Sequence, residues 1–378
     1  MKNKVKMSIY IIIGSVFLLL AITRSCFYSI NQPLVRQTGK LVNKEKSSRY
    51  YYGYGFFKEN IYYWRNLALG DGPEKLENVD KKTFTVLSER FAKDKNRVYS
   101  GSVGDKNVDA PTFEYVVSQK DEETGFGRDK NHVYSLYSYE RGENSVFKIV
   151  PDANPATYQA LENNWSKDDK NVYYRFVKVD ADAQTFVNIN YYYSKDKNYL
   201  YSQGLRDSIR KEKCNTSELS LIADNNLYIR TKTRIYFSCD DYFTSLPLKD
   251  TASIKNLYDG RWLNVDEKIV VDGTWLNSPD VDEKTFVSLG WGFFKDNKNV
   301  YFGKWKTPGN KNNLVIIADA DLNTFEQIGG NYAKDKNHVY YRNEIISGVN
   351  PNNFSYDKES NYGYSGKNVY FLGEKTIK

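Results

Sequence analysis

The chain is poor in the residues that most often build catalytic centres. Its 378 residues include two histidines, three cysteines and two methionines. A Ser-His-Asp triad or a zinc site therefore has few residues to draw on, and neither a Gly-rich phosphate loop nor a Cys-x-x-Cys pair occurs. His132 and His338 both follow a polar turn motif, where solvent is expected. The sequence therefore predicts no catalytic, cofactor-binding or metal site, and a protein that is not an enzyme.

The charge of the chain gives little reason to expect a nucleic-acid partner. Lys and Arg number 54 and Asp and Glu 47, a net charge of +7, but four of the positive residues flank one apolar run near the N-terminus: Lys2, Lys4, Lys6 and Arg24. Subtracting these four from +7 leaves +3 for the rest of the chain. Nucleic-acid binding needs a basic stripe on one face, so the sequence predicts no nucleic-acid binding.

The N-terminal region has the pattern of a membrane anchor. Residues 1–6 are a basic tail, and residues 7–23 are almost free of polar groups. As a helix this run spans about 25 Å, close to the ~30 Å of a hydrocarbon core. The basic tail stays in the cytoplasm by the positive-inside rule, which predicts a single-pass protein with the remaining chain on the extracytoplasmic side. A cleaved secretory signal and a lipoprotein acylated at Cys26 are the alternatives. Residues 24–46 are predicted to form a polar linker.

Cys214 and Cys239 are the other two cysteines. An oxidising compartment outside the membrane permits a disulfide, and the two residues bracket a stretch of chain that lacks the repeated turn described next. A disulfide between them and a pair of buried free thiols are both compatible with the sequence.

Two short phrases are repeated along the chain. The first is an Asp-Lys-Asn turn that leads into an apolar residue and a tyrosine. Its copies begin at Asp94, Asp129, Asp169, Asp196, Asn297 and Asp335. The second precedes it and consists of Asp or Asn, two residues, usually Thr, and an aromatic residue. Its aromatic residues are Phe84, Phe113, Tyr158, Phe186, Phe286, Phe325 and Phe354.

Each phrase has a physical interpretation. Asp or Asn at the head of the second phrase favours a helix N-cap or an Asx turn, so the aromatic residue would enter the core from one short helical turn. The Asp-Lys-Asn segment tolerates left-handed backbone, which a tight β-hairpin needs. The valine and tyrosine after it point to opposite faces of a strand. Their recurrence predicts a strand that is buried on both faces, as in stacked repeats.

The spacing of these phrases predicts an all-β chain of tandem β-hairpin repeats. About ten units fit between residues 47 and 378, and the turn is degraded near Thr231 and Val265. An open curved solenoid is the preferred architecture, because unequal unit lengths do not suit the equal blades of the alternative, a β-propeller.

The repeated Asp-Lys-Asn-x-Val-Tyr phrase resembles the DKNYY family of bacterial repeat proteins. The resemblance implies no established activity, cofactor or site residue. From the residues themselves we expect a membrane-anchored, exported module that binds or scaffolds in the cell envelope, with an unknown envelope protein or glycan as its partner. The alternative is an exported hydrolase with a site in the divergent stretch 214–272, where the repeat rules lapse.

Overall fold

The protein is described by a computed structural model. It describes residues 40–46, 49–52, 60–65, 72–118, 123–135, 147–203, 208–239, 242–304 and 314–376. The predicted basic tail, membrane helix and Cys26 lie outside these ranges, as does the predicted linker up to residue 39. Among the described residues, no helix has the length and apolar character needed to cross a membrane.

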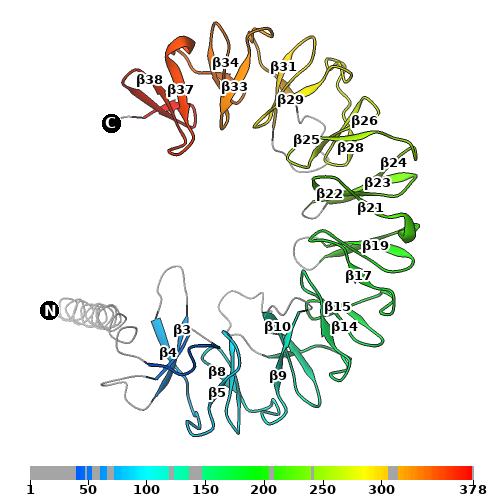
Figure 1. The fold of residues 1–378 in the computed structure, drawn as a ribbon, viewed down its shortest axis with the longest axis vertical. Helices are drawn as coiled ribbons and strands as arrows, with labels where there is room; N and C mark the ends of the chain where they lie inside the picture. The colour runs from blue at the N-terminus through cyan, green and yellow to red at the C-terminus, as the bar shows by residue number, and fades with distance from the viewer. Residues whose placement is uncertain are drawn as a thin grey trace, which may run out of the picture. The chain divides into compact units, whose positions relative to one another are not determined.

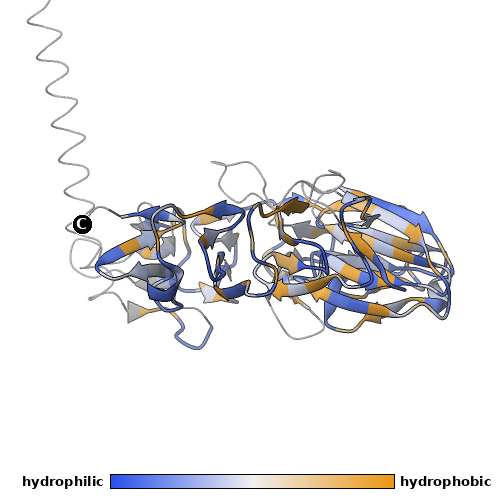
Figure 2. Cartoon of the chain, turned by 90° about the horizontal axis from the view of Figure 1, so that it is seen from above, coloured by the Kyte–Doolittle hydropathy of each residue, from blue (hydrophilic) through white to orange (hydrophobic). Residues whose placement is uncertain are grey.

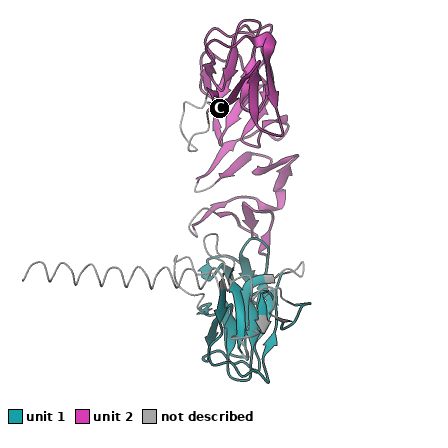
Figure 3. Ribbon diagram, turned by 90° about the vertical axis from the view of Figure 1, so that its left-hand side faces the viewer, with its two compact units in different colours: residues 1–184 teal, residues 185–378 magenta. Residues whose placement is uncertain are grey.

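The described residues form ten four-stranded antiparallel sheets. In each sheet every strand is hydrogen-bonded to the next strand along the chain, so each sheet is a simple meander (Figure 1). The all-β prediction is confirmed, and the only helices in the described ranges are the single-turn 3-10 helices η3 (Thr216–Glu218) and η4 (Pro351–Asn353). The chain divides into two compact units, residues 1–184 and 185–378, which Figure 3 colours separately.

The first unit contains four of the sheets. Their strands are β1 (Lys40–Leu41), β2 (Tyr50–Tyr52), β3 (Ile61–Arg65), β4 (Gly72–Lys75), β5 (Thr85–Val86), β6 (Phe91–Lys93), β7 (Val98–Ser100), β8 (Val103–Asp105), β9 (Glu114–Val117), β10 (Glu123–Arg128), β11 (Val133–Ser135), β12 (Lys148–Ile149), β13 (Gln159–Ala160), β14 (Trp165–Lys167), β15 (Val172–Tyr174) and β16 (Val177–Val179).

The second unit contains the other six. Their strands are β17 (Val187–Asn188), β18 (Tyr193–Lys195), β19 (Tyr199–Gln203), β20 (Ile209–Lys213), β21 (Ser220–Ile222), β22 (Asn225–Arg230), β23 (Arg234–Cys239), β24 (Tyr242–Pro247), β25 (Ile254–Tyr258), β26 (Trp262–Val265), β27 (Lys268–Val271), β28 (Thr274–Trp275), β29 (Val287–Gly290), β30 (Phe293–Lys295), β31 (Val300–Gly303), β32 (Leu314–Ile316), β33 (Glu326–Gly329), β34 (Tyr332–Lys334), β35 (Val339–Tyr341), β36 (Glu344–Ile345), β37 (Phe354–Asp357), β38 (Tyr362–Ser365), β39 (Asn368–Phe371) and β40 (Glu374–Lys375).

The third strand of a repeat is buried on both faces, as the sequence predicts. In β35, Val339 and Tyr340 are both fully buried. Val339 packs in a cluster with Phe354 of the following sheet, whereas Tyr340 packs in another with Phe293 of the preceding sheet. Figure 2 shows apolar and hydrophilic segments alternating along the strands. The sheet β33–β36 therefore contributes to two cores, one shared with each neighbouring sheet.

The second phrase of the repeat forms a short hydrogen-bonded turn. The carbonyl of Asp321 accepts the N–H groups of Thr324 and Phe325 at 3.2 and 2.9 Å, and Phe325 is buried against the cluster that contains Tyr340. In the last repeat the turn is the 3-10 helix η4, whose N-cap Asn350 accepts the N–H of Asn352. The predicted capping residue and the predicted buried aromatic residue are both confirmed.

Candidate functional site

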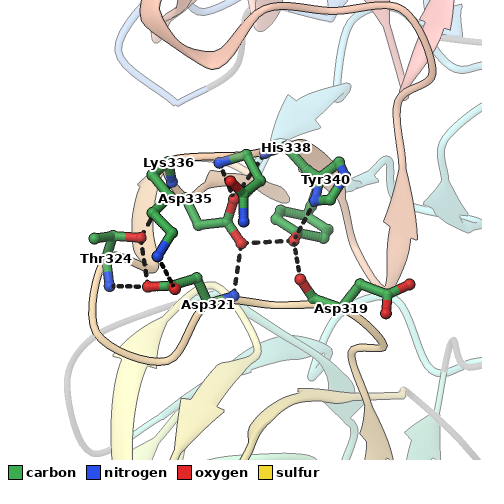
Figure 4. Close-up of polar contacts among 8 residues, drawn as sticks. Asp319, Asp321, Thr324, Asp335, Lys336, His338 and Tyr340 are labelled. Atoms are coloured by element: carbon green, nitrogen blue, oxygen red, sulfur yellow. Dashed lines mark hydrogen bonds and ion pairs between the residues drawn. The ribbon is translucent and has the colours of Figure 1, made fainter.

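A buried carboxylate organises the hairpin between β34 and β35. One carboxylate oxygen of Asp335, Oδ1, accepts the backbone N–H groups of Asn337 and His338, both at 2.7 Å. The N–H of Asp335 in turn donates to the carbonyl of His338 at 3.0 Å. The side chain thus closes its own turn in the manner of an Asx turn (Figure 4).

The other oxygen of Asp335 joins this turn to two more distant parts of the repeat. Oδ2 accepts the hydroxyl of Tyr340 and the backbone N–H of Asp321, both at 2.7 Å. Asp335 is 4% exposed and Tyr340 is 0% exposed. A buried charge costs free energy unless hydrogen bonds replace its water, and here the carboxylate receives four: two from its own turn, one from the tyrosine and one from the preceding loop.

A second, half-buried carboxylate lies beside this network. The Asp321 side chain accepts the ammonium group of Lys336 at 2.6 Å and the hydroxyl of Thr324 at 2.8 Å. The same Thr324 hydroxyl oxygen accepts the backbone N–H of Lys336 at 3.1 Å. The lysine of the Asp-Lys-Asn phrase is therefore held by an ion pair within its own repeat (Figure 4).

The hydrogen bonds fix the protonation states of the buried pair. Burial alone would raise the pKa of Asp335, but the N–H of Asp321 and the Tyr340 hydroxyl, with the turn amides, outweigh it and lower that pKa below its usual value. Burial and the bond to Asp335 raise the pKa of Tyr340 far above its usual range. Asp335 is thus a carboxylate and Tyr340 a neutral donor near pH 7.

The same network recurs in both units. Its shared feature is an aspartate whose carboxylate accepts a tyrosine hydroxyl five residues later at 2.6–3.0 Å. The pairs are Asp94 and Tyr99, Asp129 and Tyr134, Asp168 and Tyr173, Asp196 and Tyr201, Asp296 and Tyr301, and Asp335 and Tyr340.

Two copies of the phrase are shifted by one residue from their predicted start. The phrase is expected at Asp169 and Asn297, but the carboxylates that close these turns belong to Asp168 and Asp296, which are buried. Asp169 is exposed and accepts the hydroxyl of Thr157 instead. The five-residue spacing between the aspartate and its tyrosine is the same in all six hairpins. The position of the Asp-Lys-Asn motif is not, because in two hairpins the motif read from the sequence begins one residue after the buried aspartate.

The prediction of left-handed backbone at these turns is wrong. Positive φ occurs at many other described residues, but at none from the turn aspartate to the residue before the valine or leucine in these six hairpins. The carboxylate supplies the turn closure, so left-handed geometry is not needed. The histidines lie at these tips: His132 is exposed, and His338 Nδ1 is 3.4 Å from the Tyr340 hydroxyl.

The DKNYY family matches residues 54–205, 103–240 and 293–378. The chain belongs to the DKNYY family. No curated protein matches the sequence. The residues between the second and third of these matches, 241–292, include the sheet β25–β28, in which the family's turn is replaced.

The two sheets of the divergent stretch replace the turn in different ways. In the turn before β23, Thr231 occupies the position at which the aspartate is expected. Its hydroxyl oxygen accepts the N–H of Arg234 at 3.2 Å. Between β26 and β27, Asp266 and Glu267 form a tight turn with φ of 51° and 63°. This second turn is the left-handed type that the sequence predicts for the other hairpins.

No disulfide joins Cys214 and Cys239 in the structure. Cys214 packs with Tyr236 on one face of sheet β21–β24, and the two side chains are hydrogen-bonded. Cys239 lies three residues after Tyr236 in β23 and packs with the cluster on the opposite face. A disulfide between them, one of the two sequence-based possibilities, is therefore not present, because a sheet separates the two thiols.

The divergent stretch also contains a buried ion pair that the sequence did not reveal. Arg261 Nε donates to Asp272 Oδ1 at 2.5 Å, and the two side chains are 14% and 4% exposed. The Tyr228 hydroxyl donates to the carbonyl of Arg261 at 3.0 Å and accepts the N–H of Gly273 at 2.9 Å. These groups are hydrogen-bonded to one another. Their spacing in the sequence does not recur in the other repeats, so the repeat pattern could not predict the pair.

The described residues contain no cluster of His, Cys, Asp and Glu suited to a metal ion. The repeated carboxylates are occupied by N–H and O–H donors, and the exposed lysines Lys95, Lys130 and Lys336 are paired with Asp80, Asp109 and Asp321. The repeated chemistry of this chain is thus directed inward, at holding the repeat together.

Proposed function

We propose that this DKNYY protein is an exported binding or scaffolding module of the cell envelope, tethered by residues 7–23 acting as a single-pass membrane helix. The finer architecture we propose is an open curved solenoid. Support for it comes from the buried clusters between successive sheets within each unit, such as the one that joins Phe293 to Tyr340 and the one that joins Tyr332 to Phe354.

The observation that carries the proposal is the inward use of the repeated polar residues. Both carboxylate oxygens of Asp335 accept hydrogen bonds from its own repeat, and Lys336 is paired with Asp321. A chain that repeats a structural network many times builds length and surface. Long surfaces of this kind suit the capture or alignment of partners, and non-repeated exposed residues would supply the specificity.

The alternative, a hydrolase site in residues 214–272, has less support. The charged residues buried in that stretch, Arg261 and Asp272, are paired with each other at 2.5 Å. The thiol of Cys214 is hydrogen-bonded to Tyr236, and burial raises its pKa, which disfavours the reactive thiolate.

Crosslinking in the native cell tests the proposal. A photo-reactive residue placed at an exposed position of the repeats should capture an envelope protein or glycan. A variant in which residues 214–272 are replaced by regular repeats should capture the same partner. Loss of capture in this variant, with fold and export intact, would point to a dedicated site in that stretch and would refute the scaffold. Export itself is tested by protease accessibility of the repeats in intact cells.

A further inference from the structure

A pocket of about 450 Å³ lies in the second unit. It is formed where the third strand of a sheet turns into the fourth, and it draws residues from this region of three successive sheets. Lys304 follows β31, residues Arg342 and Asn343 form the turn between β35 and β36, and Leu372 belongs to the turn between β39 and β40. This location is separate from the Asp335 network, which lies at the turn between the second and third strands.

The pocket carries unpaired positive charge. The guanidinium of Arg342 lies over the ring of Tyr341, 5.4 Å from its centroid. Such stacking orders the guanidinium and leaves its N–H donors free at the edge of the plane. Among the described residues, neither Arg342 nor Lys304 has an ion-pair partner, whereas the turn lysine Lys336 does. An anionic ligand group would find two cations here.

Side chains that can form hydrogen bonds with uncharged ligand hydroxyls also line the pocket. Glu344 and Asn343 line the pocket. The hydroxyl of Tyr341 is buried and has no hydrogen-bond partner among the described residues. A buried hydroxyl without a partner is rare in folded proteins, so this atom marks a place where water or a ligand completes the bonding.

An apolar surface completes the pocket. Leu372 is 57% exposed. Exposure of a leucine to water does not stabilise the free protein, because apolar side chains stabilise a fold when they are buried. Its side chain therefore offers an apolar surface at the rim of the charged pocket.

We propose that this pocket binds an acidic saccharide. Arg342 and Lys304 pair with its acid group, Glu344 and Asn343 bond its hydroxyls, and Leu372 packs on the C–H face of its ring. The proposal deepens the binding role proposed above by giving the chemical class of a ligand, and it does not depend on export or on the membrane helix.

Titration calorimetry on the purified full-length chain tests this assignment with three probes. These are a glucuronate-containing oligosaccharide, a glycerol phosphate oligomer and a neutral glucose oligosaccharide of similar length. We expect the glucuronate probe to bind, with an affinity that falls as salt rises, and the neutral probe to bind at least about tenfold more weakly, since charge-assisted hydrogen bonds are the strong ones. Binding of the glycerol phosphate oligomer alone would show that the pocket takes an acid group without a sugar ring, and would contradict the assignment.

The variant Arg342→Gln should weaken binding by about tenfold or more, as expected for the loss of a charge-assisted pair. The chain supplies a matched control in Arg175→Gln. Arg175 also follows a third strand, has a φ of 58° where Arg342 has 56°, and lies over the ring of Tyr174 at 5.5 Å, yet it does not line this pocket. The control should bind like the unmodified chain, and thermal unfolding of both variants shows whether they are folded.

Three results would overturn the assignment: no binding of the glucuronate probe, equal binding of the neutral probe, or equal weakening by Arg342→Gln and Arg175→Gln in folded protein. The pocket and the proposed function are separable. If Arg342→Gln abolishes saccharide binding while crosslinking still captures the same partner, the pocket is right and the partner binds elsewhere. If no acidic probe binds while crosslinking captures a partner, only the pocket is refuted.

Discussion

The sheets β33–β36 and β25–β28 are both four-stranded meanders, yet their central hairpins are closed in different ways. In the first, the Asp335 carboxylate binds its own turn, a tyrosine and the N–H of Asp321, fourteen residues earlier. In the second, left-handed backbone at Asp266 and Glu267 closes the turn. The Asp266 carboxylate nevertheless accepts the N–H of Ser253, thirteen residues earlier, at 2.8 Å.

A third sheet, β21–β24, keeps the turn closure by the side chain at the aspartate position, which β25–β28 has lost. Thr231 binds the N–H of Arg234 within its own turn, while Tyr236 bonds to the thiol of Cys214. Turn closure and attachment of the preceding loop are thus separable tasks. One aspartate performs both in the regular repeats, and each divergent sheet retains one of them.

The largest expected effect comes from Asp335→Asn. The NH₂ group of the new amide cannot accept hydrogen bonds, so the N–H of Asp321 and the hydroxyl of Tyr340 lose their buried acceptor. We therefore expect a loss of about 2–4 kcal/mol in the free energy of unfolding. Asp266→Asn should cost less than about 1 kcal/mol, because Asp266 is exposed and accepts one loop N–H. Urea unfolding of the two variants measures the difference, and equal losses would contradict the division of tasks.

A smaller effect is expected when the tyrosines are compared. Tyr340→Phe leaves a buried carboxylate oxygen short of one donor and should cost about 1–2 kcal/mol. Tyr236→Phe loses only a bond to a thiol, which is a weak hydrogen-bonding group, and should cost less. Hydrogen exchange at the amides of Asn337 and His338 should quicken in Tyr340→Phe and stay unchanged in Tyr236→Phe. If the second variant proves the more damaging, the carboxylate is not the important partner.

The regular repeats should be sensitive to acid. The folded-state pKa values of Asp129, Asp168, Asp296 and Asp335 are lowered. Their stabilising contribution is present above the unfolded pKa of about 3.9, and it is lost as pH falls through the lowered folded values. Unfolding free energies measured between pH 6 and pH 2.5 should fall, and the fall should be shallower in Asp335→Asn. An identical slope would show that Asp335 does not titrate with folding.

The smallest expected effect comes from giving sheet β21–β24 the missing carboxylate. In Thr231→Asp the new side chain stands five residues before Tyr236 and should take over its hydroxyl, with a change in stability of less than about 1 kcal/mol. The bond from Tyr236 now opposes the burial that raises the pKa of Cys214. Its loss should move the pH midpoint of Cys214 alkylation upward, with Cys239 as the internal reference. An unmoved midpoint would show that Tyr236 keeps its bond to Cys214.

The sequence was sufficient to predict the parts of the fold that depend on local, repeated chemistry. The capping residues, the buried aromatic residues such as Phe325, and the strand buried on both faces all follow from periodicity and residue type. The family and the all-β class follow from the same repetition.

What could not be predicted depends on contacts between distant residues. The shift from Asp169 to Asp168 is invisible until burial distinguishes two adjacent acids. The left-handed turn was expected because Asn and Asp favour it, but a side-chain hydrogen bond satisfies the turn without it. The separation of Cys214 from Cys239 and the pairing of Arg261 with Asp272 depend on which face of a sheet each residue occupies.

The span of the Asp335 network has a consequence for how such a chain changes over generations. The partners of the Asp335 carboxylate all lie between Asp321 and Tyr340, inside one repeat. A duplicated or deleted copy of that segment therefore brings or removes a complete set of donors and acceptors and leaves no buried carboxylate stranded in the neighbours. Arrays built this way are free to gain or lose whole repeats by recombination, whereas a change of a single residue within the set is penalised.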